Sequence, residues 1–140
     1  GTAANIEKIG IKVNVQETDA DTEWNKLTAG EYDLLSTNWL TVQVGDPMGY
    51  MENWYSKSKA NYCSYKNEKY DKLYEELLVE TDQDKIKELV QEMQQILVDD
   101  GAALIHGYYK GNICSTKAVE GANVYTADYY WISTAIKPAE

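Results

Sequence analysis

The stretch that decides the fold reads G-E-Y-D-L-L-S-T-N-W-L-T-V-Q-V-G-D-P-M-G-Y-M-E-N-W-Y at residues 30–55 and N-Y-C-S-Y-K-N-E-K-Y-D-K-L-Y at residues 61–74. Its apolar run, Tyr32–Trp39, is predicted to be a strand that is covered on both faces. The turn Gly45-Asp46-Pro47 follows, and then a short helix is expected over Met48–Tyr55. Proteins with alternating helices and strands place ligand-binding loops at such strand ends.

The residues before this stretch extend the alternation of helices and strands. Residues 2–8 are typical of the end of a helix, and residues 11–15 alternate as a half-buried strand does. Residues 21–30 are expected to form a short helix capped by Asp21 or Thr22. This order predicts an α/β layer architecture, with a mixed sheet flanked by helices.

Two consecutive helices are predicted after a cap at Asn67. Apolar residues recur at helical spacing over 67–78 and 84–97, which predicts an antiparallel helical hairpin. Thr81 and Asp84 are expected to form a capping box between its helices. Three strands or extended segments are expected after the hairpin: 102–117, 119–125 and 129–133.

The size of the chain fits one domain. All 140 residues are expected to form a single domain, residues 1–140. No signal peptide is expected, because the start G-T-A-A-N-I-E-K has no apolar core segment. No run approaches the roughly 20 apolar residues of a membrane span.

The charge of the chain argues against several classes of partner. The formal net charge is -10, and the 13 basic residues are all lysine. Nucleic acid binding needs a basic surface, and an anionic membrane would repel this chain. Any anionic ligand would have to be held by lysine, backbone amides or hydroxyl groups.

Catalysis and metal binding have weak support in the sequence. The single histidine, His106, lies in a predicted apolar strand and is expected to be structural. Cys63 and Cys114 could form one disulfide bridge or remain two thiols, and they lack the close spacing of zinc ligands. We therefore expect no catalytic residues, no metal and no cofactor.

Ligand binding has better support, from aromatic residues near the predicted strand end. Trp24 begins the helix before the strand, and Trp39 ends the strand itself. Asp46 and Tyr50 follow in the loop and the helix after it. Indole rings offer stacking surfaces worth about 1 kcal/mol beyond their buried area. These four residues are the candidate ligand-binding site.

The ordered set of motifs resembles a known family, the family 5 extracellular solute-binding proteins of peptide and nickel ABC importers. The resemblance covers nearly the whole chain. It rests on I-E-K-I-G-I-K-V-N-V (6–15), E-W-N-K-L-T-A-G-E-Y-D (23–33), W-L-T-V-Q-V-G-D-P (39–47), N-Y-C-S-Y-K-N-E-K-Y-D-K-L (61–73), Q-Q-I-L-V-D-D-G-A-A-L-I-H-G-Y-Y (94–109) and V-E-G (119–121).

The resemblance implies most of the C-terminal lobe of a two-lobed protein with a type II periplasmic-binding-protein-like fold. Such a protein closes about a hinge on a peptide, metal chelate or sugar and delivers it to an ABC permease. It lies in the periplasm or is lipid-anchored at the outer face of the cell membrane. The N-terminal lobe would be missing from this chain.

The resemblance also implies roles for individual residues. Trp24 and Trp39 match two tryptophans that line the pocket of peptide binders. Val42 stands where such binders place an aspartate for the peptide amino group, so either Asp46 substitutes for it or the ligand is not a simple peptide.

Two other functions remain open on the residues alone. Clustered carboxylates could serve a secreted hydrolase if two of them lie roughly 5–10 Å apart in a cleft. The helical hairpin Tyr70–Leu97 could bind a partner protein if its apolar stripe is exposed.

Overall fold

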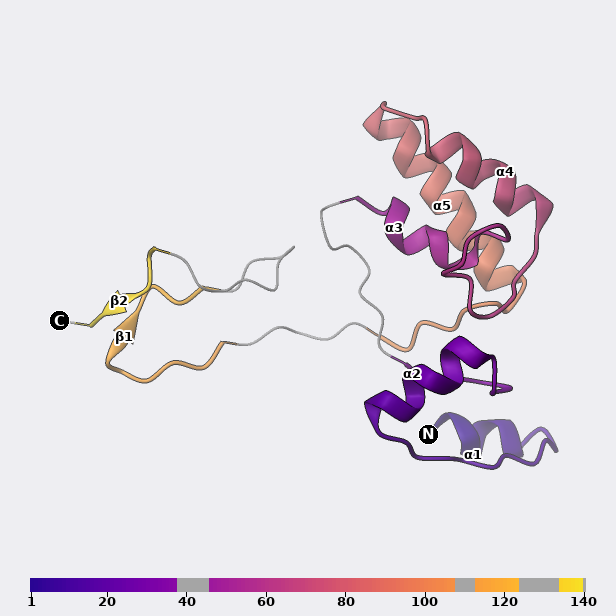
Figure 1. The fold of residues 1–140 in the computed structure, drawn as a ribbon, viewed down its shortest axis with the longest axis horizontal. Helices are drawn as coiled ribbons and strands as arrows, with labels where there is room; N and C mark the ends of the chain where they lie inside the picture. The colour runs from indigo at the N-terminus through magenta and orange to yellow at the C-terminus, as the bar shows by residue number, and fades with distance from the viewer. Residues whose placement is uncertain (38–45, 108–112, 124–133, 140) are drawn as a thin grey trace. The chain divides into compact units, whose positions relative to one another are not determined.

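The computed structural model describes residues 1–37, 46–107, 113–123 and 134–139. It divides into two compact units, Gly1–Ser36 and Thr37–Glu140, which we describe one at a time (Figure 1). No helix among the described residues combines the length and the apolar character needed to cross a bilayer.

The first unit holds two short helices. The helix α1 spans Thr2–Glu7 and α2 spans Ala20–Ala29, as the sequence predicts to within two residues. The cap of α2 is Asp19, whose side chain accepts a hydrogen bond of 2.7 Å from the Thr22 amide, so the prediction of Asp21 or Thr22 as the cap was wrong. Gly30 ends α2 with a φ of 69°, a conformation that suits glycine.

The predicted strands of this region are not found in the described residues. Residues 11–15 form no strand, and the side chains of Ile11 and Val15 are exposed. Residues 32–37 form none either, while Asn38 and Trp39 lie outside the described residues. A strand is completed by a neighbouring backbone, and no strand is present among the described residues of this unit to pair with them.

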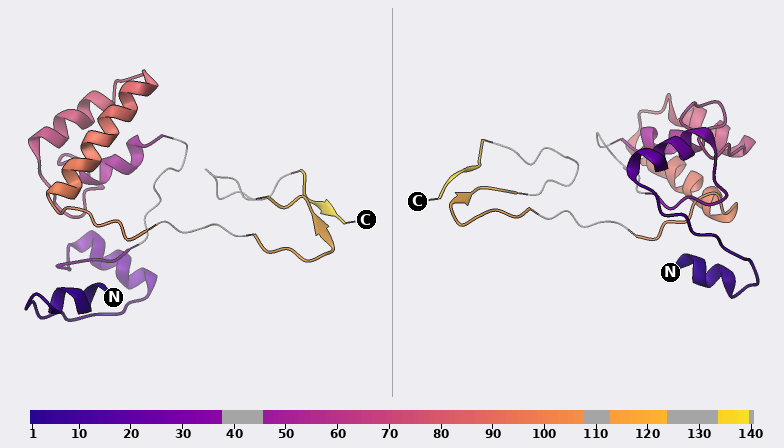
Figure 2. Two further views of the ribbon diagram at one scale, coloured as in Figure 1. Left: turned by 180° about the vertical axis from the view of Figure 1, so that it is seen from behind. Right: turned by 60° about the horizontal axis from the view of Figure 1, so that its bottom comes forward.

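Helices α3, α4 and α5 form the main packed module of the second unit. They span Met48–Met51, Glu68–Leu77 and Gln83–Asp99, and the 3₁₀ helix η1, Glu52–Trp54, continues α3. The predicted antiparallel hairpin of α4 and α5 is confirmed. Both views in Figure 2 show α3 lying beside this hairpin.

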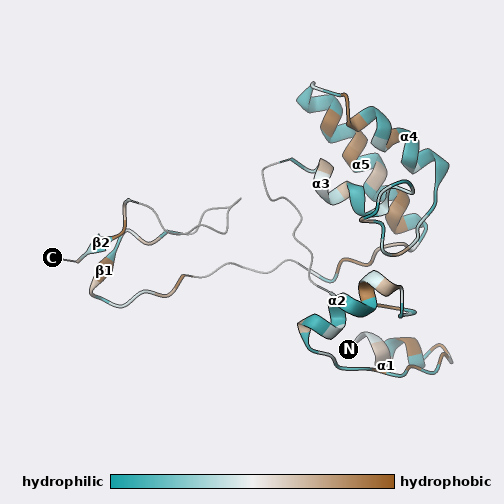
Figure 3. Ribbon diagram, in the orientation of Figure 1, coloured by the Kyte–Doolittle hydropathy of each residue, from teal (hydrophilic) through white to brown (hydrophobic). Residues whose placement is uncertain are grey.

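The core lies between the hairpin and α3. Figure 3 shows apolar segments alternating with polar ones along α5, as expected for a helix buried on one side. The buried side chains of the core are Met51, Tyr70, Tyr74, Leu77, Leu89, Val90, Met93 and Leu97. Leu78, which the periodicity placed on the same stripe, is 46% exposed because it lies just past the last residue of α4.

The caps of the hairpin helices agree with the sequence in one case and differ in the other. The Asn67 side chain accepts hydrogen bonds from the amides of Lys69 and Tyr70, so the predicted cap of α4 is confirmed. The cap of α5 is Asp82, which accepts from the Lys85 amide at 2.9 Å. The predicted capping box of Thr81 and Asp84 was therefore wrong.

The carboxylate that follows α5 has a structural role. Asp100 accepts hydrogen bonds from the Tyr65 hydroxyl at 2.5 Å and from the Asn67 side-chain amide at 2.8 Å. It thereby ties the end of α5 to the beginning of α4. This bridge accounts for an acid placed where the helix dipole alone disfavours it.

Among the described residues, the rest of the second unit contains one pair of short strands. The strand β1, Val119–Glu120, pairs antiparallel with β2, Lys137–Pro138. Gly121 follows β1 with a φ of 80°, and a Cβ there would lie 1.8 Å from the Ala135 carbonyl oxygen, so only glycine fits.

The predictions for this region were partly right. The strand predicted at 119–125 is confirmed in its first two residues, and residues 129–133 lie outside the described residues. The long strand predicted at 102–117 was wrong in its described parts, 102–107 and 113–117. The predicted mixed sheet is thus represented, in the described residues, by β1 and β2 alone.

Candidate functional site

Of the two tryptophans predicted to bind ligand, Trp24 is among the residues that the structure describes and Trp39 is not. Trp24 lies on α2, and 51% of its surface is exposed. Trp39 lies outside the described residues. Trp24 belongs to the first unit and Asp46 and Tyr50 to the second, so the structure does not place these candidates against one another.

Asp46 stands at the start of α3. Its carboxylate accepts a hydrogen bond of 2.8 Å from the Met48 amide, and its side chain is exposed. Pro47 follows it, as suits the entry to a helix. Asp46 therefore supports the local helix, whatever else it binds.

Tyr50 lies on α3 and packs partly against the core. Its ring meets that of Trp54 edge to face, with ring centroids 5.1 Å apart. Its backbone carbonyl accepts a hydrogen bond from the Asn53 side chain at 2.7 Å. Asp46 and Tyr50 thus belong to one short segment, as the sequence predicts.

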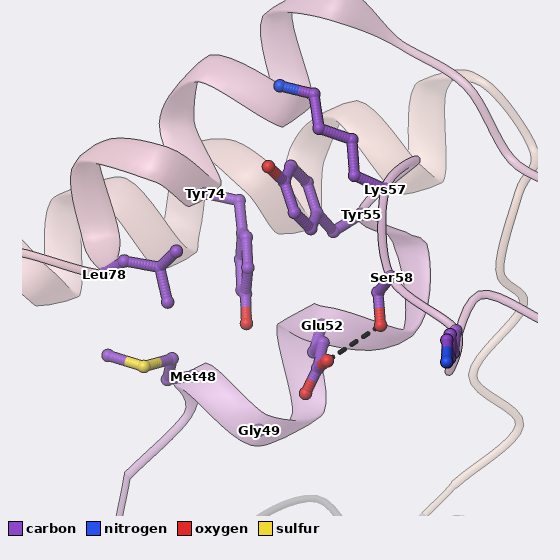
Figure 4. Close-up of a pocket in the computed structure, with 9 residues that line it drawn as sticks. Met48, Gly49, Glu52, Tyr55, Lys57, Ser58, Tyr74 and Leu78 are labelled. Carbon is purple, nitrogen blue, oxygen red and sulfur yellow. Dashed lines mark hydrogen bonds between the residues drawn. The ribbon is translucent and has the colours of Figure 1, made fainter.

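A pocket of about 550 Å³ lies beside this segment (Figure 4). α3 and η1 contribute Met48, Gly49 and Glu52, and α4 and its end contribute Tyr74 and Leu78. The loop after η1 supplies Tyr55 and Ser58. The sequence analysis did not predict this pocket, because helical spacing over 67–78 indicates only that Tyr74 lies on the apolar side of its helix.

The polar groups of the pocket are held by hydrogen bonds. The Ser58 hydroxyl donates to the Glu52 carboxylate at 2.7 Å, which fixes that side chain in the pocket. The rings of Tyr55 and Tyr74 lie 4.7 Å apart by their centroids and form an aromatic wall. Burial, with the nearby Glu52 carboxylate, raises the pKa of Tyr74 to about 12.

A second set of charges lies where the pocket meets the exposed face of α4. Glu75 accepts hydrogen bonds from the Lys57 ammonium at 2.6 Å and the Tyr55 hydroxyl at 3.0 Å. These bonds lower the pKa of Glu75 and raise that of Lys57. The Lys57 charge is therefore already paired.

The residues considered for catalysis and metal binding do not converge in the described part of the chain. It contains no group of three or more histidine, cysteine, aspartate or glutamate side chains that could hold a metal ion. Cys63 and Cys114 are exposed free thiols. His106 is exposed in a segment without strand structure, so its predicted place in an apolar strand was wrong.

The hairpin does not expose the stripe that a partner-binding module would need. Tyr70, Leu77 and Met93 are at most 1% exposed. The outer faces of its two helices carry acids, since Glu75, Glu76, Glu88 and Glu92 are exposed. Three of these acids pair with lysines: Lys57 with Glu75, Lys69 with Glu92 and Lys85 with Glu76.

Comparisons with known proteins give two matches. Residues 2–62 match the family described as "Bacterial extracellular solute-binding proteins, family 5 Middle". The chain is also 30% identical over 125 residues, 86% of its length, to the "Probable D,D-dipeptide-binding periplasmic protein DdpA" of Escherichia coli (strain K12). It spans 24% of the length of that protein. No solved structure matches the chain.

Proposed function

Because these matches confirm the resemblance of this chain to the family 5 extracellular solute-binding proteins, we propose that it forms most of the C-terminal lobe of a solute-binding component of an ABC importer. The role is binding rather than catalysis. A type II-like α/β lobe is the fold that this family implies, and the described residues contain the helices α1 to α5, the 3₁₀ helix η1 and the strand pair β1 and β2.

One observation carries the proposal. The range matched by the family, residues 2–62, contains all four residues predicted from the sequence to bind ligand. Trp24, Trp39, Asp46 and Tyr50 were selected by their positions around a predicted strand end. The family match therefore covers the segment that holds all four candidates, while the described part of the predicted strand, residues 32–37, forms no strand.

The proposed mechanism is capture by closure of two lobes. The solute binds between this lobe and a first lobe that this chain lacks, and closure shifts the population from open to closed forms. Trp24 and Trp39 stack on the solute, and Asp46 and Tyr50 supply polar contacts. The exposure of Trp24 supports this role, because a stacking residue must be reachable.

The solute is proposed to be a small peptide-like molecule. The relative that matches most of this chain carries D,D-dipeptide binding in its name. Val42 replaces the aspartate that the family resemblance implies for a peptide amino group, so we propose that Asp46 receives that group. An ammonium buried without a partner carboxylate would be costly.

The partners and location follow from the proposed function. The complete protein delivers its solute to a membrane permease of the ABC class. It works in the periplasm or at the extracellular face of the cell membrane, with a lipid anchor in the latter case. The net charge of -10 leaves nucleic acid out of the set of partners.

Calorimetric titration of the complete two-lobed protein tests the solute class. The titrants are D-alanyl-D-alanine, L-alanyl-L-alanine and the N-acetylated form of each. Saturable binding of one free dipeptide, lost on acetylation, supports a peptide-like solute held by its amino group. Absence of binding for all four at millimolar concentration would contradict the proposed solute class.

A further inference from the structure

The pocket between α3, η1 and α4 has no part in the function proposed above. Trp24, Asp46 and Tyr50 are not among its lining residues. Its volume of about 550 Å³ is nevertheless within the range of small-molecule sites. The chemistry of its walls indicates what it would accept.

The walls combine a carboxylate with aromatic faces. Glu52 is the acid that lines the pocket, and Ser58 holds it by a hydrogen bond of 2.7 Å. The Tyr55 and Tyr74 rings form one side, and Met48 and Leu78 form an apolar end. Figure 4 shows the Tyr74 hydroxyl directed into the space between Met48 and Glu52. Carboxylates and aromatic faces both attract organic cations.

Two lysines also line the pocket, and their positions decide the sign of the charge that fits. Lys57 and Lys59 are exposed, and the Lys57 ammonium is bound by Glu75 at 2.6 Å. In Figure 4 the Lys57 side chain extends away from Glu52. With Lys57 paired, Glu52 and the exposed Lys59 are the charged lining groups left for a ligand, and Glu52 is the one that Ser58 holds in the pocket.

We propose that this pocket binds a primary alkylammonium group, such as a lysine side chain or a small aliphatic amine, with Glu52 as the charged partner. The ammonium pairs with the Glu52 carboxylate and lies against the Tyr55 and Tyr74 rings. The alkyl chain lies against Met48 and Leu78. This assignment is independent of the solute-binding proposal, because it rests on other residues.

The test is a titration of the ¹⁵N-labelled 140-residue chain with n-butylammonium, followed by NMR at the backbone amides of Gly49, Glu52 and Ser58. We expect saturable shifts at these amides with a millimolar dissociation constant. 1-Butanol, which has a similar length without charge, is expected to bind at least several-fold more weakly. Butyrate is expected not to bind.

The charge partner is tested by substitution. Glu52→Gln keeps an acceptor for Ser58 and removes the charge, so we expect n-butylammonium binding about tenfold weaker, equal to 1.4 kcal/mol. Glu88→Gln, on the exposed face of α5, removes the same charge elsewhere and is the matched control. Tyr74→Phe provides a second variant, expected to weaken binding about threefold.

Three results would overturn the assignment. The first is that n-butylammonium binds the Glu52→Gln and Glu88→Gln chains with equal affinity. The second is that the unsubstituted chain binds 1-butanol as tightly as n-butylammonium. The third is that the unsubstituted chain binds butyrate more tightly than n-butylammonium. The last would identify Lys59 as the charged partner. The NMR spectrum of each variant reports its fold in the same measurement.

Discussion

The Tyr70 hydroxyl on α4 donates a hydrogen bond of 2.7 Å to the backbone carbonyl of Met51 at the end of α3. Tyr70 is 0% exposed and Met51 is 1% exposed, so the bond is closed to water. It fixes the short helix α3 against the hairpin. The pocket depends on this contact, because α3 and α4 form two of its sides.

Tyr70→Phe is expected to destabilise the chain by about 1 kcal/mol, because the Met51 carbonyl loses the side-chain donor that joins it to α4. Tyr55→Phe is the matched control, since the Tyr55 hydroxyl donates to the exposed Glu75, and should change stability by less than about 0.5 kcal/mol. Urea unfolding followed by circular dichroism measures both. Equal stability of the two variants would show that the Tyr70 bond does not anchor α3.

Asp82→Ala is expected to cost about 1 kcal/mol of unfolding free energy, because the Lys85 amide loses its capping acceptor. Thr81→Ala should change stability by less than about 0.5 kcal/mol, because its hydroxyl is no part of the observed cap. The same urea titration compares them. If Thr81→Ala lost more unfolding free energy than Asp82→Ala, the result would contradict the Asp82 cap and support the capping box of Thr81 and Asp84 that the sequence predicts.

The stability contribution of Asp100 is expected to depend on pH. Hydrogen bonds from Tyr65 and Asn67 lower the pKa of Asp100 in the folded chain. The contribution is therefore fully present above the unfolded pKa of about 3.9 and is lost as the pH falls through the lower folded value. Asp100→Ala should lower the urea midpoint at pH 7, with the difference shrinking below about pH 4. A difference independent of pH would contradict the ionic character of this bridge.

The helical hairpin was predictable because helices satisfy their backbone groups locally. The spacing of Tyr70, Tyr74 and Leu77, and of Leu89 and Met93, identified the buried faces of both helices. Strands need a partner backbone, and alternation over residues 11–15 carries no information about whether one lies beside them. The caps were harder, because Asp21 and Thr22 lie close to the actual cap Asp19, and Thr81 lies next to the actual cap Asp82.

The pocket could not be read from the sequence for a different reason. Glu52 and Tyr74 lie 22 positions apart and meet only because α3 packs on α4 through Met51. Asp46 was identified from its Gly-Asp-Pro turn, but its capping bond to Met48 depends on α3 forming there. A local motif was enough to identify Asp46, but the contact between Glu52 and Tyr74 depends on how α3 packs against α4.

Trp39→Ala in the complete protein is expected to weaken solute binding about tenfold, because a stacking surface is lost. Trp24→Ala is expected to weaken it similarly, and Trp24→Phe less, since a phenyl ring retains part of that surface. Calorimetric titration with the solute that binds measures all three. Unchanged affinity of Trp39→Ala would remove that residue from the proposed site.

The most direct measurement of the proposed function is native mass spectrometry of the complete protein, purified from cells without added ligand. The expected result is a 1:1 adduct with a small peptide-like molecule, which dissociates on collisional activation and is identified by its fragments. A protein that carries no adduct, and that acquires none when incubated with a mixed di- and tripeptide library, would contradict the assignment as a peptide-type solute-binding protein.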